Sequence, residues 1–260
     1  MFRLVFTSLT LSCILPSIIV AQLVSDGPML PSNEVPQSGV GVFGGIAFNR
    51  HAVDIPSFFP FVCCPENVQS GSGEGITIGV QYKQAVNDRL YLLGRIAYLT
   101  HDVVLVGTTA KPTQVLSELD EIVLTRRQEV AMDIASLTTA VHVGYRVYDE
   151  LSVQAGLQVD SFTGIDYVYT EKLLSDEYRW VNNPNNERIA DKGELSDLLR
   201  NDYQYGLVFG IRYEIPLYPA PRLILAPELQ YNHYFTDVMP EADWQARSYL
   251  AFVSLSYYFD

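Results

Sequence analysis

Eight stretches of the chain alternate apolar and polar positions with a period of two, which predicts β-strands. The clearest runs from Tyr203 to Ile215, where aromatic and aliphatic residues occupy one face and Gln204, Arg212 and Glu214 belong to the other. The last runs from Ser248 to Phe259, almost to the chain terminus. The predicted strands cover residues 40–48, 76–83, 90–98, 136–146, 151–160, 203–215, 223–232 and 248–259. The pattern predicts an all-β protein.

The apolar faces are uniform and carry aromatic residues at both ends, which is typical of strands that face lipid. Short connections (85–88, 149–150, 218–221) alternate with long ones (49–74, 101–135, 162–202), and 236–243 is intermediate. We therefore expect a monomeric, antiparallel transmembrane β-barrel of about eight strands, with short periplasmic turns, long extracellular loops and both termini in the periplasm. Two aromatic girdles follow from this assignment: Tyr82, Tyr145, Tyr213, Tyr257 and Phe259 at the short-turn end, and Phe48, Tyr98, Tyr203, Tyr205, Phe235 and Tyr249 at the other.

Two local features depart from the strand pattern. Pro227 interrupts the seventh strand, where it removes a ladder hydrogen bond, and we expect a β-bulge there. In the third long loop, leucines recur at helical spacing, which predicts a short helix over Glu194 to Leu199.

The N-terminal segment predicts export. Residues 1–21 combine Arg3 with an apolar run and end at Ile19-Val20-Ala21, as in a secretory signal peptide; a membrane helix is the alternative, but the run is short and Pro16 breaks it. Residues 22–38 are rich in proline and predict a flexible periplasmic lead-in, so the barrel domain is expected over residues 39–260. The cysteine pair Cys63-Cys64 is expected to have a structural role in a loop.

Composition narrows the functional classes. The formal net charge of −13 argues against nucleic acid as a partner, because binding phosphate requires clustered Lys and Arg. No Cys and His residues occur at zinc-ligand spacing, and no calcium-loop pattern is present, so we expect neither a metal nor a cofactor.

The faces that point inward carry ionisable residues: Lys83, Arg95, His142, Arg146, Asp160, Arg212, Glu214 and Glu228. An eight-stranded barrel leaves just enough room for side chains to fill its interior. Charges confined there must pair, and Glu228, Arg95 and Arg212 lie nearest the middle of their strands, so we expect an internal salt-bridge network that plugs the lumen. The alternative is that Arg95, Arg146, Asp160, Arg212, Glu214 and Glu228 line a narrow channel.

An enzyme is the less favoured class. None of His51, His101, His142 and His233 has a neighbouring Ser and acid in a hydrolase arrangement, so we name no catalytic residues. For the acidic, polar loops, the favoured interpretation is that they are solvated and bind nothing. Contact with lipopolysaccharide through divalent ions, or with another surface protein, is the alternative.

Several short motifs resemble OmpA-type outer-membrane barrels of the Bacteroidota and related phyla. They are Phe61-Val62-Cys63-Cys64-Pro65 followed by Gly71-Ser72-Gly73-Glu74-Gly75, Tyr213-Glu214-Ile215-Pro216-Leu217, and Pro227-Glu228-Leu229-Gln230-Tyr231. The resemblance implies an eight-stranded barrel of the cell outer membrane. In longer relatives a peptidoglycan-binding domain follows the barrel; this sequence lacks it, so cell-wall anchoring is not carried over.

Overall fold

The computed structural model describes residues 38–54, 70–114, 121–175, 178, 186–194, 201–217, 220–239 and 243–259. They form the strands β1 (Ser38–Asp54), β2 (Ser70–Ala85), β3 (Leu90–Thr100), β4 (Val103–Gln114), β5 (Glu121–Arg146), β6 (Leu151–Leu173), β7 (Glu187–Glu194), β8 (Tyr203–Tyr213), β9 (Ile215–Leu217), β10 (Ala220–Tyr234) and β11 (Asp243–Phe259). Within these ranges, no helix is long and apolar enough to cross a membrane.

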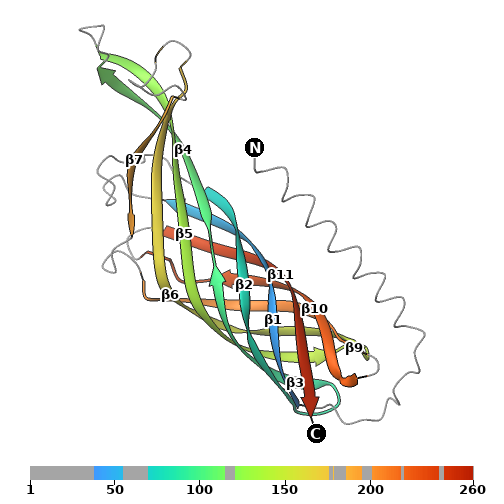
Figure 1. The fold of residues 1–260 in the computed structure, drawn as a ribbon. Helices are drawn as coiled ribbons and strands as arrows, with labels where there is room; N and C mark the ends of the chain where they lie inside the picture. The colour runs from blue at the N-terminus through green and yellow to red at the C-terminus, as the bar shows by residue number, and fades with distance from the viewer. Residues whose placement is uncertain are drawn as a thin grey trace.

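Eight of the strands close into an antiparallel ring, which confirms the predicted fold class. The order around the ring is β1, β2, β3, β5, β6, β8, β10, β11. Closure comes from β1 and β11, which pair from Ser38 opposite Phe259 to Asp54 opposite Asp243. Figure 1 shows the tilted strands of this ring, and β4 with the long strands β5 and β6 continuing beyond it.

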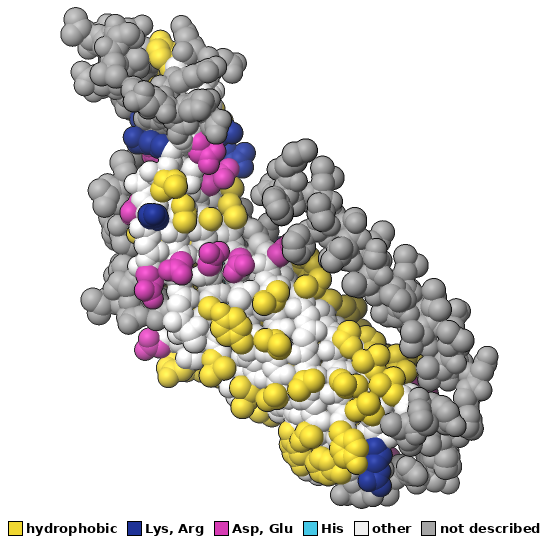
Figure 2. Space-filling model, in the orientation of Figure 1, with side chains coloured by type: hydrophobic (Ala, Val, Ile, Leu, Met, Phe, Trp, Pro, Cys, Tyr) yellow, Lys and Arg dark blue, Asp and Glu magenta, His cyan; other side chains and the backbone are white. Residues whose placement is uncertain are grey.

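Burial alternates along each strand of the ring, so one set of side chains fills the lumen and the other covers the exterior. In β8, for example, Gln204, Val208 and Arg212 are buried, whereas Leu207 and Ile211 are exposed. Many exposed large residues on the ring are aliphatic or aromatic, such as Ile78, Leu157 and Phe209. In Figure 2 hydrophobic side chains occupy the lower part of the visible face.

Much of the chain predicted as long loops is instead strand. Residues 103–114 form β4 and residues 121–135 form the outer half of β5, and β5 and β6 reach 26 and 23 residues. Inward and outward side chains continue to alternate there, but the outward positions are often polar or charged, such as Asp133 and Asp166. These segments therefore lack the uniform apolar face from which the other strands are predicted. The paired extensions rise beyond the ring and carry β7 on the edge of β6.

The bulge predicted at Pro227 is wrong. Its register with β11 continues unbroken, with Pro227 opposite Val253. On the other side, the ladder with β8 ends at Glu228–Arg212 and the ladder with β9 begins at Leu225–Ile215, so the gap between β8 and β9 lies beside the proline. The missing N–H is thus accommodated by an interruption of the neighbouring strand.

Several predicted features lie outside the described residues. These are the signal segment 1–21, most of the lead-in 22–38, the Cys63-Cys64 pair, and the part of the proposed helix after Glu194. Ser38 already belongs to β1, and Glu194 is the last residue of β7.

Candidate functional site

Glu228 of β10 is the centre of an ionic layer across the lumen. Its carboxylate accepts hydrogen bonds from the guanidinium groups of Arg95 and, at 2.6 Å, Arg212. Gln154 Nε2 and Ser254 Oγ donate to the same carboxylate at 2.9 and 3.2 Å. A buried carboxylate requires such a complete set of donors, because its desolvation costs several kcal/mol.

Glu214 forms the second carboxylate centre, nearer the short turns. It accepts from Lys83 Nζ at 2.7 Å, from Arg212 Nε at 2.9 Å and from Tyr258 OH at 2.6 Å. Arg146 lies 3.8 Å away and is partly exposed. Arg212 therefore bridges the two carboxylates, and the layer is one network.

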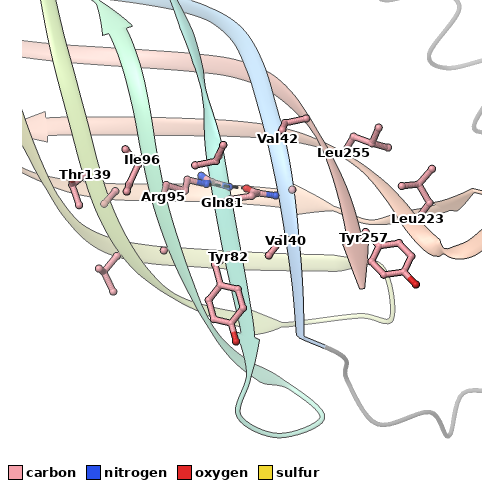
Figure 3. Close-up of a pocket in the computed structure, with 15 residues that line it drawn as sticks. Val40, Val42, Gln81, Tyr82, Arg95, Ile96, Thr139, Leu223, Leu255 and Tyr257 are labelled. Carbon is pink, nitrogen blue, oxygen red and sulfur yellow. Dashed lines mark hydrogen bonds between the residues drawn. The ribbon is translucent and has the colours of Figure 1, made fainter. Parts of the chain in front are cut away.

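A cation–aromatic contact lies on the outer side of this layer. The Arg95 guanidinium lies 4.8 Å from the centre of the Phe252 ring and 5.3 Å from that of Phe43. Gln81 accepts a hydrogen bond from Arg95 Nε at 3.2 Å, and Figure 3 shows both side chains inside the barrel, whereas Tyr82 and Tyr257 point away from it. Parity along the strands predicts that these residues face inward, but not that they meet.

Asp160 belongs to a different cluster, although the sequence suggested one network of inward charges. Its carboxylate accepts from Tyr234 OH at 2.7 Å and from Gln158 Nε2 at 2.8 Å, and His101 Nε2 lies 3.3 Å away. All four side chains are buried toward the outer end of the barrel. The structure thus brings together Arg95, Arg146, Arg212, Glu214 and Glu228, and separates Asp160 from them.

An apolar core closes the outer end. It combines inward residues of the strand extensions with residues that precede or begin β11: Val53, Val103, Leu105, Val130, Met132, Ile134, Phe162, Ile165, Tyr169, Val238, Met239 and Trp244. Trp244 Nε1 donates to His51 Nδ1 at 2.8 Å. His51 lies beyond the membrane girdle; its burial and the nearby His101 lower its pKa to about 3. The sequence does not predict this core, because most of its residues fall in segments that are expected to be loops.

One small cavity lies between the ionic layer and the Asp160 cluster. Its volume is about 20 Å³, and its lining includes Arg95, Thr138 and His142. Within the described chain, both ring nitrogens of His142 and Thr138 Oγ1 lack a hydrogen-bond partner. A cavity of this size, with unpaired polar atoms in its wall, has room for a single water molecule.

The exterior changes character abruptly beyond the apolar band. Glu74, Asp102, Asp133, Asp166 and Glu194 form an acidic row from β2 to β7. Asp133 is directly opposite Asp166, which is opposite Glu194, and Asp102 lies near Asp133. Glu74 lies beside Asp102, because the glycines on either side of it face the backbone of residues 100 and 102. The row is visible in Figure 2 above the hydrophobic region. Desolvation and the nearby Asp133 carboxylate raise the pKa of Asp102.

The two girdles also form, since every residue assigned to them is exposed except the half-buried Phe259.

Solved structures of small outer-membrane barrels resemble this fold. Ail of Yersinia pestis is 9% identical, with a TM-score of 0.35 and 85% of this chain and 100% of that one covered. Neisserial surface protein A is 10% identical, with a TM-score of 0.39 and coverage of 87% and 100%. OprG of Pseudomonas aeruginosa is 11% identical, with a TM-score of 0.38 and coverage of 88% and 98%. Similarity at this level assigns no function. No protein-family model and no curated protein matches the chain.

The architecture itself fixes the environment. A closed barrel satisfies its backbone hydrogen bonds between strands, and an apolar exterior between aromatic girdles suits hydrocarbon rather than water. The protein is an integral barrel of the bacterial outer membrane, with short turns on the periplasmic side and long hairpins outside.

Proposed function

We propose that the protein is a closed outer-membrane barrel with a structural or surface-interaction role, which it performs through its outer end. The observation that carries this proposal is the filling of the lumen at successive levels. The ionic layer around Glu228, the Asp160 cluster and the apolar core around Trp244 each cross the barrel interior.

The apolar core is the strongest argument against conduction. Ions and small solutes cross a pore through water or polar ligands, and a packed apolar constriction supplies neither. Leu105, Ile165 and Trp244 have no exposed surface in this core. A narrow channel remains the second candidate function, since the water-sized cavity at His142 interrupts the packing of the lumen.

The outer end offers the interaction surface. The extensions of β4, β5 and β6 with β7 form a sheet outside the membrane, and the acidic row crosses its base. Contact with outer-membrane lipid, with lipopolysaccharide through divalent ions, or with a surface protein suits this arrangement.

We also propose that the barrel is a monomer of the OmpA type without enzymatic activity. In the described residues, no three His, Cys, Asp or Glu side chains are placed to hold a metal.

Solute flux tests the proposal. The refolded protein is reconstituted into liposomes loaded with an impermeant polymer, and swelling is followed in isosmotic glycine and arabinose, with a known porin as the positive control. Swelling at the rate of protein-free liposomes is expected. Swelling in glycine by the correctly inserted protein would support the channel and overturn the closed barrel.

A further inference from the structure

A row of basic residues lies on the outside of the barrel, over β1, β11 and β10. Arg50 of β1 is directly opposite Arg247 of β11, and Arg247 is directly opposite His233 of β10. Both arginines are exposed and the histidine is half-buried, all on the outward face. His233 and Arg247 belong to the consecutive strands β10 and β11, whereas Arg50 is distant in the sequence and joins them because β1 and β11 close the ring (Figure 1).

Within the described part of the chain, the two arginines have no anionic partner. Side chains directly opposite in an antiparallel pair lie roughly 5 Å apart at Cβ, and like charges there destabilise the sheet. Among the described residues, neither Arg50 nor Arg247 forms an ion pair within 4.0 Å. Glu74 is diagonal to Arg50, opposite Phe48 on β2, and it too forms no such pair. An external anion would relieve this repulsion.

The position of the row identifies the source of that anion. One step toward the membrane centre, Phe48, Tyr249 and Tyr231 form the next cross-strand row, and the Tyr231 and Tyr249 rings are 5.1 Å apart. The following row is Ile46, Ala251 and Leu229, of which Ile46 and Leu229 are exposed to the apolar phase. From the outside toward the membrane centre, a basic row is thus followed by an aromatic row and then by an aliphatic row. This order matches a lipid whose phosphate lies outermost and whose acyl chains lie innermost.

We propose that Arg50, Arg247 and His233 form a binding site for the phosphorylated head group of an outer-leaflet lipid. A guanidinium group donates two parallel hydrogen bonds to phosphate, and two such groups at one site match a phosphate dianion. The acidic row occupies the rim over β2 to β7, so an anionic head group is directed to the β1–β11 side. The inference rests on the barrel's orientation in the outer membrane and not on whether its lumen conducts.

Binding of defined lipids tests the site. The refolded protein is placed in nanodiscs of phosphatidylcholine with either diphosphoryl lipid A or the same lipid with its phosphates removed, and retained lipid is counted by native mass spectrometry. The test variant is Arg50→Gln/Arg247→Gln. The matched control is Arg127→Gln/Lys172→Gln, which removes the same charge from an opposed, exposed pair on β5 and β6 further from the membrane. The gel shift between unboiled and boiled samples verifies folding.

We expect the wild-type protein and the control variant to retain the phosphorylated lipid about tenfold more tightly than its dephosphorylated form, and the test variant to lose that preference. Equal retention of the two lipids by the wild type would overturn the proposal, and this comparison needs no variant to fold. Undiminished preference in the test variant would also overturn it. Displacement of the lipid by inorganic phosphate in millimolar excess would show a free-anion site and contradict a lipid ligand.

Discussion

Arg212 and Glu228 form a salt bridge at 2.6 Å in which neither side chain has any exposed surface. The same guanidinium donates through Nε to Glu214 at 2.9 Å. One arginine therefore joins the two carboxylates of the lumen, and the ionic layer is expected to respond to substitution as a unit.

Removal of the central carboxylate should destabilise the barrel. Glu228→Ala leaves Arg95 and Arg212 without their shared partner, which for a buried pair costs on the order of 3–5 kcal/mol. We expect a lower urea midpoint for unfolding of the refolded protein. The matched control is Glu129→Ala, which breaks an exposed pair with Arg127 at 2.7 Å and should cost about 1 kcal/mol or less. Equal midpoints for the two variants would exclude a stabilising ionic layer.

The geometry of Arg212 should matter as much as its charge. Arg212→Lys keeps the positive charge but cannot donate from two separated nitrogens to Glu214 and Glu228 at once. We expect a loss of about 1–3 kcal/mol in the free energy of unfolding, corresponding to one buried carboxylate with an unsatisfied position. Wild-type stability in this variant would show that charge alone sustains the layer.

The outer core should be sensitive to acid through His51. Its pKa is lowered to about 3 in the folded protein, whereas in the unfolded chain it is about 6.5. Below pH 6.5 the unfolded state binds the extra proton, so stability is lost as pH falls from 6.5 toward 3, by at most about 1.4 kcal/mol per pH unit. His51→Gln keeps an acceptor for Trp244 and removes the titration.

Unfolding free energies from pH 7.5 to 4 check this expectation. The unfolding free energy of His51→Gln minus that of the wild type should increase as the pH falls below 6.5, because only the wild type loses stability through this histidine. A constant difference over the whole range would contradict a buried, neutral His51.

Two glycines offer a matched test of the lumen's packing. A Cβ on Gly45 would clash with the Ala251 carbonyl oxygen and with Phe252, whereas a Cβ on Gly94 meets nothing within 4 Å. Gly45→Ala is expected to cost about 1–3 kcal/mol through overpacking, and Gly94→Ala to be neutral or slightly stabilising. Melting of refolded samples, followed by circular dichroism, measures both. A well-tolerated Gly45→Ala would mean that the lumen near Phe252 is loosely packed.

The sequence predicts the strands of the ring because a period of two assigns each residue to one of two faces. That rule puts Arg95, Arg212 and Glu228 on one face, and their central positions suggest that they meet. It does not predict at which level of the barrel a residue lies, since the level depends on the register between strands. Asp160 was therefore grouped with Glu228, although its partners are Tyr234 and Gln158.

The remaining failures have local causes. Outside the membrane the outward positions of β4 to β6 include Asp133 and Arg127, so the strands lose the apolar exterior that marks them in the ring. Pro227 was expected to deform its own strand, but the structure interrupts the neighbouring ladder instead. Both outcomes depend on which strands become neighbours, and a single sequence does not contain that information in readable form.

Single-channel conductance in a planar bilayer tests the closed lumen most directly. The refolded protein is inserted at single-molecule level, and correct insertion is verified by the gel shift of the same preparation. We predict no current steps for the wild type or for Glu228→Gln, because the apolar core around Trp244 seals the barrel independently of the ionic layer. Reproducible steps in the wild type that change in Arg95→Ala would contradict the closed barrel and identify the inward charges as a channel lining.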